Sequence, residues 1–222
     1  MNPYTKISLL FITNFLAFKI GGLWIGLISL CIVVYKILNI IGYTRNPSIF
    51  KGSFQNGISF TKDYVGPYSQ HKDAFLEAAK LIETYKLKNF VVFAIYYDMP
   101  NTVEESKLKC SIGIYQKNFD KVPEEFERYC EQNGYNKNEL PNANSLYSSW
   151  EYINYSSMMI GINKFYKLMN YNLKDANFKR IFRVDESKIK VFIEVYEQPN
   201  SSMSFYIPLL NSEKFLIFKK DK

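Results

Sequence analysis

The first 45 residues are dominated by apolar side chains and contain no acidic residue. Residues 20–35 carry no charge, and Lys19 and Lys36 bracket them. This run is slightly shorter than the roughly 20 residues of a membrane-spanning helix. Lysine stems that reach the two interfaces, or continuation to Tyr43, would complete the span. The pattern therefore predicts one transmembrane anchor within residues 1–45, followed by a soluble domain.

A second apolar block, residues 7–18, precedes this span. It has the length of a signal-peptide core, but no small-x-small cleavage site follows it, and the next apolar run comes directly after. We therefore favour an uncleaved anchor, with block 7–18 lying in the interface, lengthening the helix or packing on a partner. The larger basic cluster, Lys36, Arg45 and Lys51, follows the span. This placement favours a domain on the cytosolic or matrix side.

Beyond the anchor, strand and helix patterns follow one another in an order that repeats. The first half predicts a strand at 49–60, a helix from Ser69 to Leu87, and strands at 90–97 and 108–115. The second half predicts a strand at 146–153, a helix at 157–169, and strands at 181–184, 189–196 and 203–209. Between the halves, Pro123 begins a short helix in a polar connection that ends at Pro141.

The repeat is also visible in the letters. Residues 92–101 align with residues 191–200 at an offset of 99, and five of the ten positions are identical. Together with the element order, this match predicts an α+β fold: an N-terminal transmembrane helix followed by a duplicated β-α-β-β domain with a cleft between its halves. The expected boundaries are 46–222 for the domain and about 46–118 and 143–212 for its halves.

The net charge of +7 invites a nucleic-acid interpretation. However, all 21 acidic residues lie at Asp63 or later. Without Lys6, Lys19 and Lys36, the remaining 25 basic and 21 acidic residues leave a net charge of +4. Acids and bases are interspersed in that part, so we exclude nucleic acid as the main partner.

Cysteine and histidine usage excludes further classes of protein. The three cysteines, Cys31, Cys110 and Cys130, are odd in number, and the first lies inside the apolar segment. A disulfide framework is therefore not expected, and we place the domain in a reducing compartment. His71 is the only histidine, which excludes a His-rich metal site and any catalytic site that needs two histidines. We expect no metal and no cofactor.

Several short motifs, taken in order, resemble the GyrI-like (SOUL/gyrase-inhibitor) effector-binding family, and in particular its membrane-anchored branch. After the apolar anchor, these are FTKDYVGPY at 60–68, AIYYDMP at 94–100, KCSIG at 109–113, FIEVYEQP at 192–199 and YIPL at 206–209. The resemblance covers nearly the whole chain. It implies a sheet-lined groove between the two halves that binds hydrophobic, often cationic, small molecules. It also implies an acid on a strand of the second half, and Glu194 is the matching position.

Strand alternation points to the same residue independently. Two sets of side chains should face opposite ways, Val191, Ile193 and Val195 toward the core and Phe192, Glu194 and Tyr196 away from it. A carboxylate between two rings can bind a cation through charge and cation–π contact. The alternative is a solvent-exposed or hydrogen-bonded glutamate. Further groove candidates, each of which can instead serve packing alone, are Tyr68, Tyr97, Trp150 and Tyr206.

Three functions fit these features. We expect a membrane-anchored, non-catalytic binding or scaffolding module, an accessory subunit of a larger organellar assembly such as one of the mitochondrial inner membrane. The alternative is an endoplasmic-reticulum ligand-binding or autophagy-receptor-like protein, although such receptors carry a long acidic tail and this chain reaches Lys222 soon after its last predicted strand. The third is a hydrolase that uses Glu194. Expected partners are the lipid bilayer, other subunits of a membrane complex, and a hydrophobic or cationic small molecule.

Overall fold

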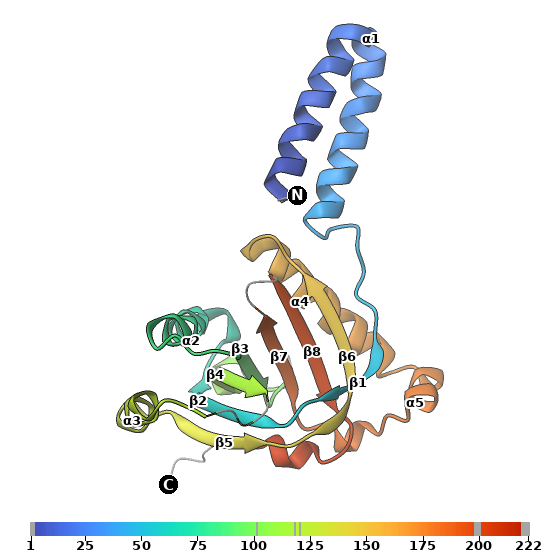
Figure 1. Ribbon diagram of the computed structural model, residues 1–222. Coiled ribbons are helices and arrows are strands. Elements are labelled where there is room, and N and C mark those ends of the chain that lie inside the picture. The colour runs from blue at the N-terminus through green and yellow to red at the C-terminus, as the bar shows by residue number, and fades with distance from the viewer. Residues whose placement is uncertain (1–2, 101, 118, 120, 198–200, 219–222) are drawn as a thin grey trace. The chain divides into compact units, whose positions relative to one another are not determined.

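A computed structural model describes residues 3–100, 102–117, 119, 121–197 and 201–218. The chain forms two compact units, one of residues 1–47 and 150–169, the other of residues 48–149 and 170–222. The first contains α1 (Pro3–Ile40) and most of α4 (Tyr155–Asn172). The second contains nearly all of the sheet (Figure 1).

The apolar N-terminal region forms two helical arms instead of one straight span. α1 is helical except at Gly22, where φ is 70° and ψ is −170°. The chain reverses there, so that residues 3–21 and 23–40 run side by side (Figure 1). The arms approach so closely that a Cβ atom at Gly26 would lie 2.1 Å from the Phe18 ring. Block 7–18 therefore packs on the second arm. By length and composition, Tyr4–Ile40 is the one described helix that could cross a membrane.

The second unit is built on an eight-stranded antiparallel sheet with the order β1-β6-β8-β7-β3-β4-β2-β5. The strands are β1 (Phe50–Phe54), β2 (Gly57–Val65), β3 (Phe90–Tyr96), β4 (Lys109–Lys117), β5 (Asn136–Leu140), β6 (Ala143–Glu151), β7 (Phe192–Glu197) and β8 (Ser202–Pro208). The order is symmetric about the β7–β3 pair. The first strand of each half, β1 or β5, lies at the far edge of the other half.

The strand bounds and their symmetric order in the sheet confirm the predicted duplication of element order behind an apolar helix. Phe54 lies opposite Ala143 where β1 meets β6, and Gly57 lies opposite Leu140 where β2 meets β5. A shift of 86 residues carries β1 onto β5 and β2 onto β6, so the first two strands of each half are equivalent. The α+β class is therefore confirmed, with a further strand at the start of each half.

The letter match at an offset of 99, by contrast, is not the structural equivalence. Phe93 pairs with Val195 in the core cluster, whereas Phe192 pairs with Tyr96 on the opposite face. Side chains alternate along a strand, so a shift by an odd number of residues exchanges the two faces. The matched residues 101 and 198–200 lie outside the described residues.

The remaining elements are helices and short 3₁₀ turns. They are α2 (Lys72–Thr84), α3 (Glu124–Gln132), α5 (Ala176–Phe182), η1 (Tyr68–Gln70), η2 (Glu105–Lys107), η3 (Glu186–Lys188) and η4 (Ser212–Phe215). The strand predicted at 181–184 is wrong, because α5 occupies this region. Asp175 caps that helix by accepting a hydrogen bond from the Asn177 amide, and Arg183 ends it with φ at 58°.

The two faces of the sheet are covered differently. One carries a buried cluster that includes Phe54, Phe93, Val195 and, from η4, Phe215. Val191, Ile193 and Val195 belong to this cluster, as the alternation predicts. α2 covers the opposite face, where its Phe75 ring meets the Tyr196 ring at 5.2 Å.

Candidate ligand-binding site

Glu194 lies in β7, one of the two central strands, opposite Ala94 of β3. Only 2% of its surface is exposed. Tyr196, two residues along the strand, points to the same face, and its hydroxyl donates a hydrogen bond of 2.5 Å to Glu194 Oε2. A carboxylate thus occupies the middle of the sheet, on the face that carries α2.

Aromatic rings from three other elements extend this site. Phe75 of α2 meets the Tyr196 ring edge-on, and the His71 ring lies 5.0 Å from Phe75. His71 Nε2 is 3.3 Å from the Tyr96 hydroxyl of β3, and Tyr68 of η1 lies 4.8 Å from the Tyr96 ring. We call Glu194, Tyr196, Phe75, His71, Tyr96 and Tyr68 the aromatic cluster. Its members come from β7, β3 and the segment that begins α2.

Burial and the Glu194 carboxylate shift the titration of neighbouring groups. Burial, followed by the negative charges of Glu194 and Asp63, raises the pKa of the Cys110 thiol. Burial also raises the pKa of the Tyr68 hydroxyl, with a smaller contribution from Glu194. Burial lowers the pKa of His71 to about 4. At neutral pH the cysteine is therefore a protonated thiol, a poor nucleophile, and the histidine is uncharged.

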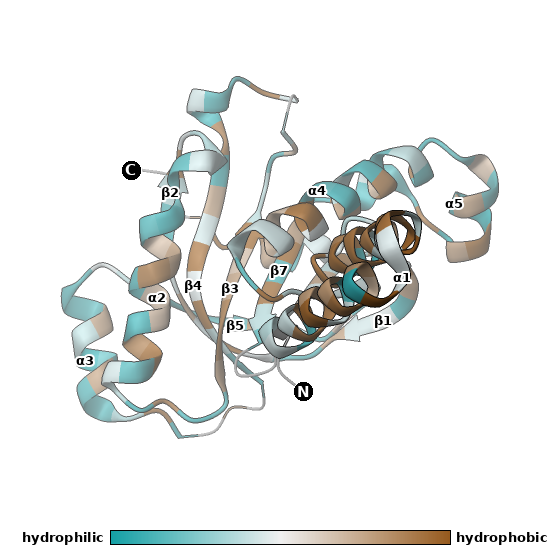
Figure 2. Cartoon of the chain, turned by 90° about the horizontal axis from the view of Figure 1, so that it is seen from above, coloured by the Kyte–Doolittle hydropathy of each residue, from teal (hydrophilic) through white to brown (hydrophobic). Residues whose placement is uncertain are grey.

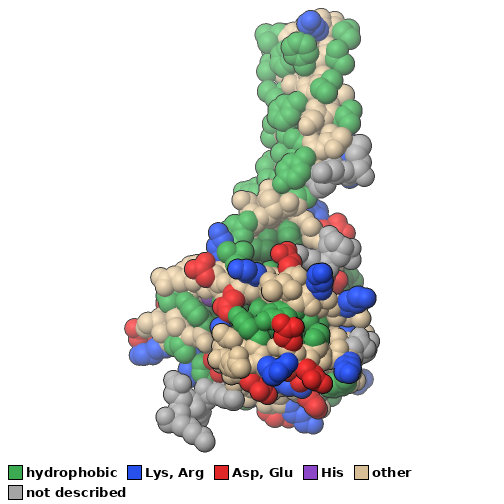
Figure 3. Space-filling model, turned by 60° about the vertical axis from the view of Figure 1, so that its left-hand side comes forward, with side chains coloured by type: hydrophobic (Ala, Val, Ile, Leu, Met, Phe, Trp, Pro, Cys, Tyr) green, Lys and Arg blue, Asp and Glu red, His purple; other side chains and the backbone are tan. Residues whose placement is uncertain are grey.

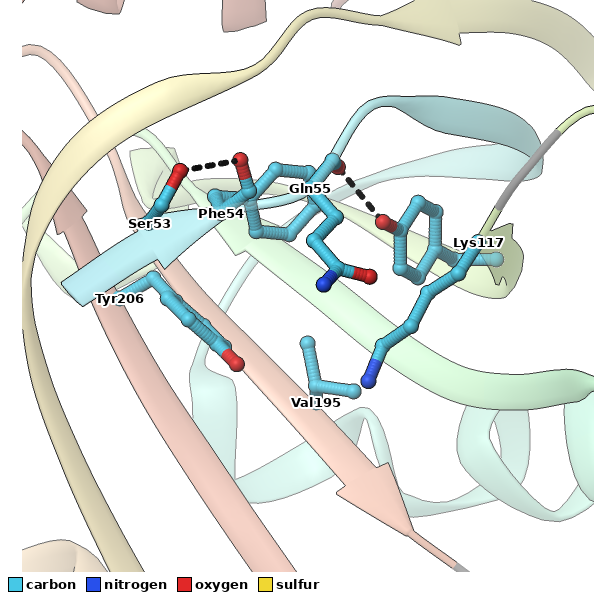
Figure 4. A pocket seen from close by; sticks show the side chains of 7 residues that line it. Ser53, Phe54, Gln55, Lys117, Val195 and Tyr206 are labelled. Carbon is cyan, nitrogen blue, oxygen red and sulfur yellow. Dashed lines mark hydrogen bonds between the residues drawn. The ribbon is translucent and has the colours of Figure 1, made fainter.

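Two other residues expected at the groove lie on the opposite face. The Tyr97 hydroxyl is 2.8 Å from Ser111 Oγ, which donates to Asp63 Oδ1 at 2.6 Å. Tyr206 packs on Phe54, with ring centroids 5.4 Å apart. It lines a hollow of about 50 Å³ bordered by β1, β4 and β7 (Figure 4). Neither tyrosine reaches the Glu194 face, because Tyr206 pairs with Ile193 and Tyr97 packs on the same cluster.

The remaining predicted residues divide between the two compact units. Phe192 shares the face of Glu194 and is 6% exposed. Trp150 belongs to the unit that contains α1. Its indole Nε1 donates to the Ser157 carbonyl at 3.0 Å, and the Arg45 guanidinium lies 4.7 Å from its ring. Of the seven predicted residues, Glu194, Phe192, Tyr196 and Tyr68 thus lie on or beside one face of the sheet.

Sequence reasoning missed three members of the cluster. Phe75 lies in the helix predicted from Ser69 to Leu87 but was not assigned to the site, and His71 was considered only in excluding metal and catalytic sites. Tyr96 alternates with Ala94 and faces the same way, but the sequence does not reveal that β3 pairs with β7. Only that pairing brings Tyr96 opposite Phe192 and close to Glu194.

Glu194 is covered in this structure, whereas Tyr68, His71 and Phe75 are partly exposed. Two hollows among the described residues have volumes of about 50 and 340 Å³, and Glu194 lines neither. The larger is bordered by Lys86, Lys88, Lys121 and the start of α3. Among the described residues, no group of three or more His, Cys, Asp or Glu side chains could hold a metal ion.

No protein-family model and no curated protein matches this sequence. The C-terminal domain of EcmrR has a similar structure, with a TM-score of 0.44 and 12% identity over 73% of this chain and 96% of that one. The structure of SAV2435 bound to tetraphenylphosphonium has a TM-score of 0.47 and 10% identity, over 76% of this chain and 98% of that one. The structure of a hydrolase encoded by lin2189 from Listeria innocua has a TM-score of 0.40 and 11% identity, over 74% of this chain and 91% of that one. At these identities, and with TM-scores below 0.5, the similarities indicate nothing about what this chain binds or catalyses, and they assign it to no family.

Proposed function

We propose that this chain is a membrane-anchored, non-catalytic binding protein whose sheet domain binds a hydrophobic organic cation at the aromatic cluster. One observation carries the proposal. A carboxylate that is 2% exposed lies in the centre of the sheet, hydrogen-bonded to Tyr196 and within a continuous series of ring contacts. The GyrI-like resemblance of the sequence points to the same position and ligand class.

The chemistry of the cluster selects for a particular kind of ligand. A carboxylate attracts positive charge, and the faces of tyrosine rings add cation–π attraction that strengthens when water is excluded. The rings also reward burial of apolar surface, at roughly 25 cal/mol per Å². A small hydrated ion such as sodium would gain little from the rings. A delocalised cation with aromatic or aliphatic substituents would gain from both contributions.

A ligand could enter if the segment that begins α2 moved away from the sheet. Tyr68 and His71 come from η1 and the residue before α2, and neither helix has a side-chain cap at its start. Gly66, just before this segment, has φ at 142°, a conformation that other residues rarely adopt. The Tyr68 hydroxyl also donates hydrogen bonds to the carbonyl oxygens of Asp98 and Lys109 at 2.9 and 2.8 Å, so this movement would break two hydrogen bonds as well as ring contacts. We propose that the ligand replaces part of these contacts.

Titration of the full chain in lipid nanodiscs with tetraphenylphosphonium, a permanent cation surrounded by phenyl rings, tests this function. Empty nanodiscs correct for partitioning into lipid, and neutral triphenylphosphine oxide tests the need for charge. We expect Glu194→Gln to weaken the affinity by about tenfold or more, because it removes the charge and keeps the shape. Glu197→Gln, three residues along the same strand, is the matched control and should bind like the parent. Equal affinity of the parent and Glu194→Gln, or no binding by the parent, would contradict the proposal.

The narrower role expected from the sequence, an accessory subunit of an organellar assembly, stays a prediction. Extraction in mild detergent followed by size-exclusion chromatography addresses it. A co-purifying complex would support the role, whereas a lone 26.1 kDa chain would count against it.

A further inference from the structure

We propose that α1 crosses the membrane twice as a helical hairpin, so that the N-terminus and the sheet domain lie on the same side of the bilayer. The inference rests on the membrane anchoring proposed above. It replaces the single membrane crossing expected from the sequence with two crossings. It specifies the bilayer as the partner of the hairpin surface and places the turn at the opposite interface.

The reversal at Gly22 is encoded by residue type. A φ of 70° with ψ of −170° lies in a region that is essentially restricted to glycine. A Cβ atom at this residue would meet no other atom within 4 Å, so the backbone, rather than crowding, requires glycine here. Gly26 then lets the second arm approach the Phe18 ring of the first. One glycine permits the turn, and the other permits the close contact between the arms.

The lengths and charges of the arms fit a bilayer. With a rise of about 1.5 Å per residue, residues 3–21 and 23–40 extend about 27–28 Å, close to the roughly 30 Å of a hydrocarbon core. Lys6 and Lys36 both lie near the open end of the hairpin, and Lys19 lies three residues before the turn. Residues 7–18 and 20–35 carry no charge. Charged groups therefore occur near the two ends of the hairpin and not between them.

The hairpin is mostly hydrophobic by residue type (Figure 2), and the face seen in Figure 3 carries mainly hydrophobic side chains. Examples are Ile20 at 85% exposure, Trp24 at 77% and Phe15 at 61%. The hydroxyls of Ser8 and Thr13 donate to carbonyl oxygens of the preceding turn, as they must in lipid. Asn14 is an exception, because its Oδ1 has no hydrogen-bond partner among the described residues. A surface of this kind is stable in contact with lipid and costly in contact with water.

The turn itself requires a polar environment. A helix reversal leaves carbonyl groups before Gly22 and N–H groups after it without partners in the same helix. Lipid-exposed irregular backbone does not occur within the hydrocarbon region. The Lys19 ammonium lies 5.3 Å from the Phe15 ring and would be costly at the centre of a bilayer. These groups place the turn at the opposite interface rather than within the membrane.

Both ends of the hairpin meet the same segment of the chain. The Tyr4 hydroxyl lies 3.5 Å from the Ile153 carbonyl oxygen, and Arg45 donates to the Glu151 carbonyl at 2.9 Å. Lys164 of α4 donates 2.5 Å hydrogen bonds to the carbonyl oxygens of Tyr43 and Arg45. Residues 150–164 therefore contact both the first turn of the hairpin and the segment that follows its second arm, which is the arrangement that a same-side topology requires.

Cysteine labelling of the full chain tests the topology. The chain would be synthesised in the presence of sealed microsomes, in a Cys31→Ala background that retains the buried Cys110 and Cys130. Single cysteines would replace Thr5 near the start of α1, Ile20 beside the turn, and Lys188, whose side chain is 63% exposed in the sheet domain. A membrane-impermeant maleimide would be added before and after permeabilisation. We expect Thr5→Cys and Lys188→Cys to react on one side and Ile20→Cys on the other.

Each alternative topology gives a different pattern. Labelling of Thr5→Cys and Lys188→Cys on opposite sides would establish a single crossing and overturn the proposal. Protection of Ile20→Cys under both conditions would place the turn inside the membrane and overturn the double crossing. Alkaline carbonate extraction separates these results from a failure of anchoring, because a chain released by carbonate was never embedded. Ligand binding at Glu194 is independent of all these readouts.

Discussion

The helical hairpin and the sheet domain use the same kinds of side chain in opposite ways. In α1, Ile20 and Trp24 are 85% and 77% exposed, whereas Phe93 and Ile95 of β3 are fully buried. A domain in water gains stability by removing apolar surface from solvent, at about 25 cal/mol per Å². The hairpin instead leaves its large apolar side chains exposed on its outer surface. This difference is what the proposed insertion of the hairpin into a bilayer predicts.

The comparison extends to polar groups. In the sheet domain, charges of both signs are dispersed over the surface, and the buried Glu194 has a hydrogen-bond donor (Figure 3). In the hairpin, charges occur only near the ends. Stability of the sheet domain should therefore depend on packing and on pH, and that of the hairpin on lipid and on the hydrogen bonds at its base.

The largest effect should follow removal of a buried ring from the sheet. Phe93→Ala creates a cavity in the core cluster and should lower the free energy of unfolding by about 3–5 kcal/mol. Phe15→Ala, which removes a ring that is 61% exposed in α1, is the matched control. Thermal unfolding of the full chain in nanodiscs would measure both. Equal destabilisation by the two changes would remove the distinction between the regions.

A smaller effect is expected at the base of the hairpin. Lys164→Ala removes the donor to the Tyr43 and Arg45 carbonyls and should cost about 1–3 kcal/mol locally, the usual contribution of charged hydrogen bonds. Hydrogen exchange should increase at residues 38–45 and stay unchanged in β3 and β4. Lys167→Ala, on an exposed position of the same helix, is the control. Unchanged exchange at residues 38–45 would show that these bonds do not hold the hairpin.

Acid should affect the sheet domain through His71. Burial lowers its pKa from 6.5 to about 4, so the unfolded chain binds more protons between these values. Stability should therefore fall as the pH drops below about 6.5, and this loss should be complete below about 4. Because the ring is partly exposed, we expect a loss on the order of 1 kcal/mol. His71→Phe should reduce the decrease measured by chemical denaturation between pH 7 and pH 4. A variant with the same pH dependence as the parent would refute this role.

The smallest effect concerns a partly exposed ion pair on the sheet domain. Glu77 of α2 accepts hydrogen bonds from Lys62 at 2.8 Å and from Tyr135 at 2.9 Å. The bond from Lys62 lowers the pKa of Glu77, so its contribution is present at neutral pH and lost as the carboxylate protonates in acid. Glu77→Gln should cost less than about 1 kcal/mol at pH 7. Glu83→Gln on the same helix is the control, and a loss above 2 kcal/mol would indicate a larger role than solvent screening allows.

Local patterns predicted most of the regular elements. The apolar stripe of α2 and the apolar run of β3 were found because amphipathic and buried segments have distinct periodicities. β5 was missed because its sequence, NKNEL, is polar and its partner, β2, is distant in the chain. α5 was read as a strand because a short apolar run does not distinguish the two structures.

The candidate site was predicted only in part, for a similar reason. Glu194, Phe192 and Tyr196 share a face because side chains alternate along one strand, which is a local property. Tyr206 and Tyr97 were assigned to the same groove without knowledge of register. The pairing of Tyr206 with Ile193 places it on the core face instead. Register depends on contacts between distant segments, and a change of one residue exchanges the two faces.

The amino-acid sequence alone therefore determined an apolar N-terminal region, a duplicated α+β domain and an acid on the strand face opposite the core. These follow from composition, periodicity and alternation, which act over a few neighbouring residues. The tertiary structure decided that α1 folds back at Gly22, that β3 pairs with β7, and that His71, Phe75 and Tyr96 join Glu194. Those features depend on which distant surfaces meet, and the free energy of such contacts is absent from any local stretch of sequence.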